Sequence, residues 1–218
     1  MTTTGKQIFT TLESDGTLTV EVATSEFPEP KGNQVLVRME AAPINPSDLA
    51  LLLGPADLEN ADYSDGKIVA KMPEPFNSGA KGRHGQRLPV GNEGAGEVIA
   101  TGDSDMAKAL MGQRVACVPG TAYSRYAIAD ASMCLPLGDH SAEDGASSFV
   151  NPMTALGFAE NAKMDGQEAI LHTVGASNLG QMLVKICQED GLGLVNIVRK
   201  SDQVDLLKDL GAKHIVNS

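Results

Sequence analysis

The stretch Glu168 to Lys200, EAILHTVGASNLGQMLVKICQEDGLGLVNIVRK, decides the fold of this chain. Its first apolar run, Ala169 to Thr173, leads into a glycine-bearing turn, and a second apolar run follows at Leu194 to Val198. Between them, apolar side chains recur at helical spacing: Leu179, Met182, Leu183, Ile186 and Cys187. The pattern predicts a strand, a helix with one apolar face and a parallel strand, which together form a βαβ unit.

The turn reads Gly175-Ala176-Ser177-Asn178-Leu179-Gly180, a G-x-G-x-x-G dinucleotide fingerprint in which Ser177 replaces the middle glycine. Gly175 permits a sharp exit from the strand, and Gly180 allows close packing of helix and strand. The helix N-terminus offers N–H groups and the positive end of its dipole to a pyrophosphate. The Cβ of Ser177 limits how closely backbone approaches phosphate, although its hydroxyl could bind the same oxygen. The turn therefore predicts nucleotide binding, while glycine also serves ordinary strand-to-helix turns.

Two cations, Arg199 and Lys200, follow the second strand of this unit. An NAD enzyme places a carboxylate there for the ribose 2′-hydroxyl, whereas a cationic pair suits a 2′-phosphate. The pair therefore predicts NADPH as the cofactor, bound more tightly than NADH. The alternative is an ordinary strand end exposed to solvent.

The composition describes a globular chain of 218 residues, 42% hydrophobic and 21% charged, with a net charge of −11. No apolar run is long enough to span a bilayer, and the acidic excess repels nucleic acid and anionic membranes. Cys117, Cys134 and Cys187 form no disulfide pattern, and the start of the chain lacks an apolar signal core. We expect a soluble cytoplasmic protein that acts on a small molecule.

The part of the chain before this unit is predicted to be rich in β-structure. Short apolar or alternating runs span Ile8 to Leu12, Leu18 to Val22, Val35 to Met39, Arg114 to Val118 and Tyr123 to Ile128. Ser47 or Asp48 could cap a short helix that runs through Leu53. Prolines, glycines and mixed charges at 54–88 indicate a long irregular loop, either a lid or a surface excursion.

These motifs together resemble a known family. Five of them occur in order: Ile44-Asn45-Pro46-Ser47-Asp48, Gly91-Asn92-Glu93-Gly94-Ala95-Gly96, Asn151-Pro152-Met153-Thr154-Ala155, the glycine turn, and Leu210-Gly211-Ala212-Lys213-His214. The chain is similar to zinc-independent medium-chain dehydrogenases/reductases, the quinone oxidoreductase and 2-enoyl thioester reductase branch. The resemblance implies α/β architecture with a β-rich part: a GroES-like catalytic domain at 1–150, then the first half of a Rossmann sheet at 151–218. One helix from Ala142 through Phe158 would join them.

The resemblance also implies site residues. Asn45 and Thr154 match residues that lie near the nicotinamide ring in the family, although a threonine after proline also makes ordinary local hydrogen bonds. Family members often carry a tyrosine after the Asn-Pro-Ser-Asp-like motif as a proton donor. In this chain no tyrosine stands at that position, and Tyr63, within the irregular segment, is the nearest substitute. Tyr63 also has the plain interpretation of a loop tyrosine.

Zinc is not expected in this chain. Zinc-using relatives place a cysteine at the position of Asn45 and a histidine at that of Asn92, and a neutral amide is a poor Zn²⁺ ligand. The histidines are scattered without ligand spacing: His84, His140, His172 and His214. The sequence therefore predicts no metal site.

The leading function is hydride transfer from NADPH to a quinone or to the β-carbon of an activated double bond. A zinc-free alcohol or aldehyde reductase, which would need a proton relay, and a non-catalytic NADPH-binding or interaction protein remain alternatives. A further expectation concerns the sheet: the strand Ala169 to Thr173 belongs at the centre of a full doubly wound sheet, yet only one half is present. Its bare edge should be covered by a second copy of the chain, by a separate polypeptide that supplies the missing half, or by aggregation. These residues alone would then be an inactive fragment, with weak cofactor binding and little turnover.

Overall fold

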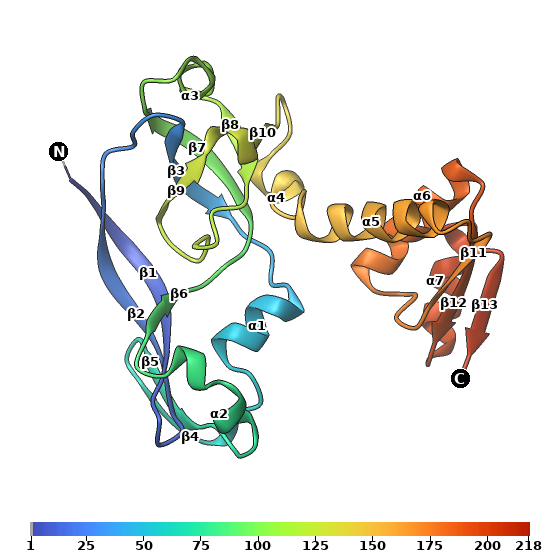
Figure 1. Cartoon of the computed structure of the whole chain (residues 1–218), viewed down its shortest axis with the longest axis horizontal. Helices are drawn as coiled ribbons and strands as arrows, with labels where there is room; N and C mark the ends of the chain where they lie inside the picture. Colours follow the sequence, from blue (N-terminus) through green and yellow to red (C-terminus); the bar gives the residue numbers. More distant parts are fainter. Residues whose placement is uncertain (1) are drawn as a thin grey trace. The chain divides into compact units, whose positions relative to one another are not determined.

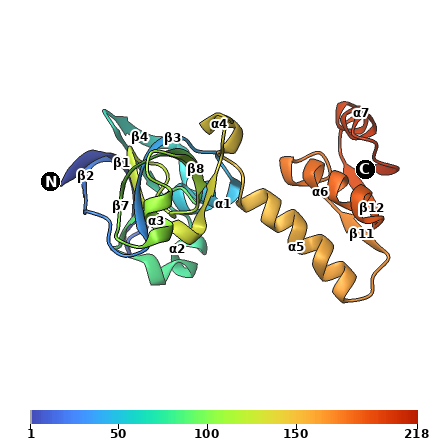
Figure 2. The ribbon, with the colours of Figure 1, turned by 90° about the horizontal axis from the view of Figure 1, so that it is seen from above.

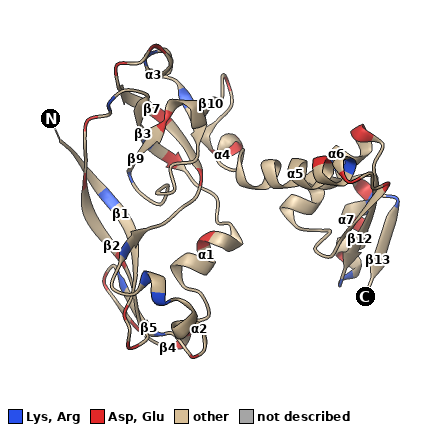
Figure 3. Cartoon of the chain, viewed as in Figure 1, with Lys and Arg blue, Asp and Glu red and all other residues tan. Residues whose placement is uncertain are grey.

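The computed structural model describes residues 2–218 and divides them into two compact units. Unit 1 extends to Ser148 and unit 2 covers Phe149–Ser218, close to the domain boundary that the sequence suggests at residue 150. Among the described residues, no helix is long and apolar enough to cross a membrane. Figure 3 shows basic residues interspersed with acidic ones in both units.

Unit 1 is built on two antiparallel five-stranded sheets, as the β-rich opening predicted (Figure 1). The first sheet has the order β4-β5-β2-β1-β6 and the second β10-β8-β7-β3-β9. The strands are β1 (Thr3–Leu12), β2 (Thr17–Phe27), β3 (Gln34–Ala41), β4 (Asp57–Ser64), β5 (Lys67–Lys71), β6 (Arg87–Pro89), β7 (Gly94–Thr101), β8 (Arg114–Cys117), β9 (Tyr126–Asp130) and β10 (Cys134–Pro136). The short helices are α1 (Pro46–Leu52), α2 (Phe76–Gly79), η1 (Lys81–Arg83), α3 (Asp105–Ala109), η2 (Ala131–Met133) and α4 (Ala142–Gly145).

The two sheets meet where β1 approaches the segment before β9. Gln7 forms an isolated antiparallel bridge with Ser124, and the Ile8 N–H donates to the Tyr123 carbonyl at 2.9 Å. Each sheet has its own apolar core, because alternate residues of its strands face inward. The joint between the sheets holds the residues around Tyr123 in place.

The segment 54–88 is not an irregular loop, and that prediction was wrong. It contains β4, β5, α2, η1 and β6, and β5 extends the first sheet by pairing with β2 from Thr17 to Glu21. Most side chains of β4 are exposed, so the strand carries little apolar alternation that a pattern search could detect. Backbone pairing with neighbouring strands, which composition does not reveal, supplies the order.

The expected single helix from Ala142 to Phe158 is also corrected, because the structure has two helices. Ser141 and Asp144 form a capping box that begins α4, with the Ser141 Oγ accepting from the Asp144 N–H at 3.1 Å. At Gly145, where α4 ends, an added Cβ would lie 2.3 Å from Leu137 Cδ1. This close packing fixes α4 on unit 1, and the next helix begins at Val150 in unit 2.

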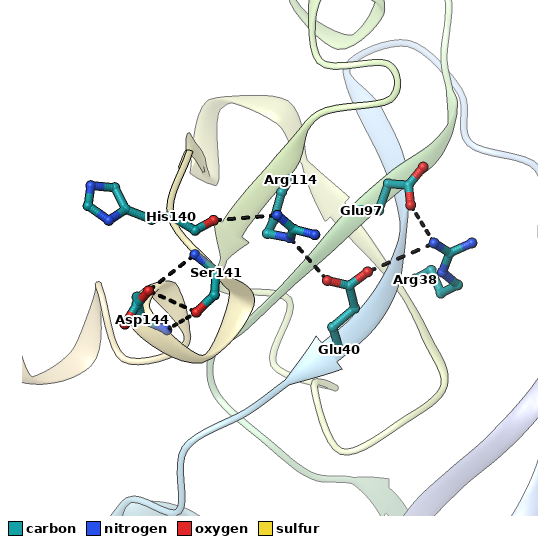
Figure 4. A network of polar contacts seen from close by, with 7 residues as sticks. All are labelled: Arg38, Glu40, Glu97, Arg114, His140, Ser141 and Asp144. Atoms are coloured by element: carbon teal, nitrogen blue, oxygen red, sulfur yellow. Dashed lines mark hydrogen bonds and ion pairs between the residues drawn. The ribbon is translucent and has the colours of Figure 1, made fainter. Parts of the chain in front are cut away.

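A surface network of ion pairs ties the second sheet to the segment before α4 (Figure 4). The Glu40 carboxylate lies 3.1 Å from Arg114 Nε and 3.8 Å from Arg38 Nη2, and Arg38 also pairs with Glu97. The Arg114 guanidinium in turn donates to the His140 carbonyl at 3.5 Å. These side chains are partly exposed, so each pair contributes at most about 1 kcal/mol.

Unit 2 confirms the predicted βαβ unit. Its elements are α5 (Val150–Met164), β11 (Ala169–His172), α6 (Asn178–Asp190), β12 (Gly193–Val198), α7 (Ser201–Asp209) and β13 (His214–Asn217). The strands are parallel in the order β11-β12-β13, and helices α5 and α6 lie side by side (Figure 2). Leu183, Leu194 and Leu207 meet in one buried cluster that joins helices to sheet.

Strand β11 forms one edge of this sheet in the described residues. It pairs with β12 from Ala169 to His172, and on it Leu171 is 62% exposed. Val174, just past the strand, is 59% exposed. The apolar open edge expected from the sequence is therefore present along β11.

Candidate functional site

One candidate site, in unit 1, surrounds the N-terminus of α1. The N-cap is Asn45, not Ser47 or Asp48 as the sequence suggested. Pro46 occupies the first helical position, where its missing N–H costs nothing, and this moves the cap one residue before it. Asp48 is the third residue of the helix, and its Oδ2 accepts the Asn45 backbone N–H at 3.0 Å.

Asp48 joins two segments that are far apart in the sequence. Its Oδ1 accepts the Asn92 backbone N–H at 2.8 Å, and its side chain is buried. The Asn92 side-chain amide donates to Ser47 Oγ at 3.0 Å, and the Asn45 amide donates to Glu93 Oε1 at 2.9 Å. Asn45, Asp48, Asn92 and Glu93 are called the Asn45 cluster below.

Sequence reasoning singled out Asn45 in this cluster but missed the roles of Asp48 and Glu93. Both carboxylates are almost fully buried, at 2% and 1% exposure. A buried carboxylate is stable only with hydrogen-bonding partners, which the amide and N–H groups provide here. The available signal was an acidic residue within a glycine-rich stretch, as Glu93 is followed directly by Gly94-Ala95-Gly96.

An apolar hollow of about 460 Å³ opens beside the cluster in unit 1. Its lining includes Ile44, Leu49, Met39 and Tyr123. The Tyr123 hydroxyl donates to the Pro43 carbonyl at 2.8 Å. Burial, and then the negative charge of Asp48, raise the pKa of Tyr123 to about 12. Tyr123 is therefore protonated at neutral pH and is a hydroxyl that the sequence analysis did not single out.

Tyr63 occupies a different setting. It lies on β4 and is 62% exposed, and its hydroxyl donates to the Leu58 carbonyl of the same strand at 2.8 Å. The hydrogen bond therefore keeps the phenol at the surface of its own hairpin. Its assignment as a proton donor stays a prediction.

Metal ligands do not gather in the part of the chain that the structure describes. Among residues 2–218, no three His, Cys, Asp or Glu side chains lie close enough to hold an ion. The Asn45 amide nitrogen faces Glu93, and His84 Nε2 contacts the Asn77 side-chain oxygen at 3.0 Å. The absence of zinc remains a prediction for elemental analysis.

A separate candidate site is the glycine turn of unit 2. Ser177 is the N-cap of α6, and its Oγ accepts the Gly180 N–H at 3.1 Å. An added Cβ on Gly180 would lie 2.2 Å from the Gly175 carbonyl oxygen, and one on Gly175 would lie 2.7 Å from Asn196 Cβ. Both positions therefore require glycine.

The turn lies at the carboxyl ends of the parallel strands. The Gly175 N–H donates to the Ile197 carbonyl at 3.2 Å, which places the turn against the end of β12. Arg199 follows that strand with an exposed side chain, and Lys200 is the N-cap of α7. The backbone N–H groups in the first turn of α6, which begins at Asn178, have no acceptor within the helix. The Ser177 side chain caps one of them. N–H donors beside two exposed cations fit the phosphates of a dinucleotide.

Thr154, the remaining predicted residue, lies on α5. Its hydroxyl donates to the Val150 carbonyl one turn earlier, at 2.6 Å. This is the ordinary local hydrogen bond that the sequence left open as the alternative. A role near a nicotinamide ring stays a prediction.

Comparison with known proteins defines the family. Residues 31–170, more than half of the chain, match the alcohol dehydrogenase GroES-like domain, so the chain belongs to this family. The solved structure of a Mesorhizobium loti protein, assigned as an NADPH:quinone reductase, is 30% identical. Its TM-score is 0.72, and the match covers 99% of this chain and 60% of that one. The resemblance inferred from the five motifs is confirmed.

The curated relatives are reductases. The mitochondrial enoyl-[acyl-carrier-protein] reductase of Bos taurus is 28% identical over 207 residues, covering 90% of this chain and 48% of the relative. Prostaglandin reductase-3 of Mus musculus is 25% identical, covering 87% and 44% respectively. The chain thus spans about half the length of the curated relatives it matches. The enoyl reductase CurK, at 20% identity and a TM-score of 0.73, shares the fold.

Proposed function

We propose that the protein is an NADPH-dependent, zinc-independent reductase that delivers a hydride to a quinone or to an activated carbon–carbon double bond. The observation that carries the proposal is the glycine turn at the start of α6 with Arg199 and Lys200 beside it, within a chain whose relatives are reductases. NADPH supplies the hydride in this chemistry, and the chain supplies binding, orientation and a proton.

The residues of unit 2 account for binding in this proposal. N–H groups at the start of α6 hold the pyrophosphate, and the Ser177 hydroxyl can donate its proton to the same oxygens while its lone pair caps the helix. Arg199 pairs with the 2′-phosphate that distinguishes NADPH from NADH. A relative solved at 21% identity is a mycobacterial protein complexed with NADPH, which supports this cofactor.

The residues of unit 1 account for the acceptor. The apolar hollow lined by Ile44 and Leu49 excludes water from an apolar substrate. We propose Tyr123 as the proton donor, because it lines this hollow and carries a hydroxyl. The role of the Asn45 cluster is positioning: Asp48 holds the Asn45 and Asn92 backbones, so the Asn45 amide keeps one orientation.

Loss of NADPH absorbance in the presence of 1,4-benzoquinone or of a 2-enoyl thioester tests the function. Tyr123→Phe should slow thioester reduction by about 100-fold, the usual effect of losing a general acid, while NADPH binding is unchanged. Tyr63→Phe is the matched control and should leave the rate unchanged. If Tyr63→Phe causes the loss instead, the donor assignment moves to Tyr63.

The alternative of a non-catalytic NADPH-binding protein gives a different result in the same assay. NADPH would bind in a titration, yet neither acceptor would be reduced by the unmodified chain. That outcome would overturn the reductase proposal for these residues and leave the cofactor assignment intact. Weak NADPH binding without turnover is instead the result expected of an inactive fragment. Reduction of simple aldehydes with neither quinone nor enoyl thioester accepted would point to the alcohol or aldehyde reductase alternative.

A further inference from the structure

Two of the three cysteines, unrelated by any sequence motif, are neighbours across strands in unit 1. Strands β8 and β10 are antiparallel, and Cys117 is the direct partner of Cys134 in their register. Both side chains belong to the core of the second sheet, so they point to the same face. Directly opposed residues have Cβ atoms about 4.5–5.5 Å apart, close to the spacing of a disulfide.

The two thiols differ in their access to solvent. Cys117 is fully buried, whereas Cys134 is partly exposed at the start of β10 and its Sγ donates to the Asp130 carbonyl at 3.4 Å. Contact between the two sulfur atoms lowers the pKa of Cys134 and, together with burial, raises the pKa of Cys117. Cys134 therefore ionises first, and the thiolate of the pair is the one that solvent reaches.

Charged groups near Cys134 do not reverse this order. The Asp130 carboxylate opposes ionisation of Cys134, yet it already accepts from Asn33 Nδ2 at 2.6 Å and from the Ser132 N–H at 2.9 Å. The hydrogen bond from the Ser132 hydroxyl, at 2.6 Å, and these two lower the pKa of Asp130. The contact with Cys117 is the larger influence on Cys134.

We propose that Cys117 and Cys134 are an oxidisable dithiol that closes to an intrachain disulfide when the protein meets a low-molecular-weight disulfide such as oxidised glutathione. The Cys134 thiolate attacks one glutathione sulfur, breaks the S–S bond and releases one glutathione thiolate. Cys117 then loses its proton and attacks Cys134 Sγ, releasing the second glutathione. Two protein thiols are oxidised by two electrons while one disulfide is reduced to two thiols.

The third cysteine provides an internal control. Cys187 lies on α6 in unit 2 and is buried, and burial raises its pKa. It is in a different compact unit from the pair and has the environment of an inert structural thiol. It should stay reduced under conditions that oxidise the pair.

The bridge would close a loop that contains functional candidates. The residues between the two cysteines include Tyr123 and the whole of β9. Cross-linking the ends of this loop reduces the freedom of the unfolded chain, so oxidation should raise the unfolding temperature of unit 1 by about 5 °C. Formation of the disulfide would therefore constrain the segment that carries Tyr123.

Trypsin makes the bridge simple to detect, because Arg125 lies between the two cysteines. The reduced protein is incubated with excess oxidised glutathione, free thiols are blocked with N-ethylmaleimide, and the protein is digested without reductant. We expect peptides 115–125 and 126–163 joined by one disulfide, with the peptide containing Cys187 alkylated. Dithiothreitol should separate the joined pair.

Variants decide between the bridge and other thiol chemistry. Cys187→Ser should form the bridge as the unmodified chain does, and Cys134→Ser should abolish it and the rise in unfolding temperature. Cys117→Ala, which leaves a small hole in the core, should accumulate glutathione on Cys134. The proposal is overturned if all three cysteines of the folded chain stay alkylated, if Cys134 carries glutathione without bridging, or if the bridges found contain Cys187.

Discussion

The Asn45 cluster and the glycine turn are both polar sites at the N-terminus of a helix, yet they are built in opposite ways. Asn45, Asp48 and Glu93 of the cluster are buried, and two of its hydrogen bonds join residues 44 and 48 positions apart. The side-chain cap of the turn is local, from Ser177 to Gly180, three positions apart, and one backbone bond, from the Gly175 N–H to the Ile197 carbonyl, ties the turn to β12. Its cations, Arg199 and Lys200, are exposed.

This difference determines whether a substitution at each site lowers stability or ligand binding. Removal of a buried carboxylate leaves the N–H groups that donated to it without an acceptor, because water does not reach them. The free energy of unfolding therefore falls. An exposed cation is already solvated, and its removal changes the binding of a ligand with little effect on folding. Substitutions in the cluster should therefore lower stability, and substitutions of the cations beside the turn should lower the affinity for a ligand.

The largest expected effect is that of Asp48→Ala. The change removes a buried carboxylate that accepts two backbone N–H groups, at Asn45 and Asn92. We expect the free energy of unfolding of unit 1 to fall by about 4 kcal/mol, because two charge-assisted hydrogen bonds are lost. Urea unfolding followed by far-UV circular dichroism measures the change.

Asp62→Ala is the matched control for Asp48→Ala. Asp62 is an exposed carboxylate on β4, so its loss should change stability by less than about 0.5 kcal/mol. Equal losses of unfolding free energy in the two variants would show that burial of the Asn45 cluster does not contribute to stability. The contrast drawn between the cluster and the glycine turn would then be wrong.

An intermediate effect is expected for Gly180→Ala in the glycine turn. The new Cβ would lie 2.2 Å from the Gly175 carbonyl oxygen, so the turn must open. We expect a loss of about 3 kcal/mol in unfolding free energy and at least a tenfold weaker binding of NADPH. Calorimetric titration with NADPH and urea unfolding measure the two changes.

Gly157→Ala is the control for this change, because Gly157 lies inside α5 and an added Cβ has no neighbour within 4 Å. Alanine is the better helix former by about 1 kcal/mol, so this variant should be slightly more stable with unchanged NADPH binding. Undiminished NADPH binding by Gly180→Ala would contradict the assignment of the turn as the phosphate site.

The smallest effect is expected for Arg199→Ala, which alters an exposed cation at the end of β12. It should weaken NADPH binding by about 1.5 kcal/mol, roughly tenfold, and leave NADH binding unchanged. Lys213→Ala is the control, since Lys213 is an exposed cation that precedes β13 at the opposite end of the parallel strands. Titration of the unmodified chain with both cofactors comes first, and equal affinities would disprove the NADPH preference.

Residues that share a turn or a helix were predictable. Gly175, Ser177 and Gly180 stand together in the sequence, and the helix after them repeats its apolar residues at the helical period. The structure places them on one strand-turn-helix element as predicted. Segment 54–88 was mistaken for a loop partly because β4 exposes most of its side chains, and pattern alone cannot detect a strand without a buried face.

The sequence by itself determined the βαβ unit and its glycine turn, because each depends on residues that are close along the chain, and the family, because each of its five motifs is a short contiguous segment. Only the tertiary structure decided that Asp48 holds Asn92, that Glu93 accepts from Asn45, that Tyr123 lines the apolar hollow, and that Cys117 faces Cys134. Those contacts arise when strands distant in sequence pair in a fixed register. Register is set by the packing of two whole sheets, and no short segment encodes it.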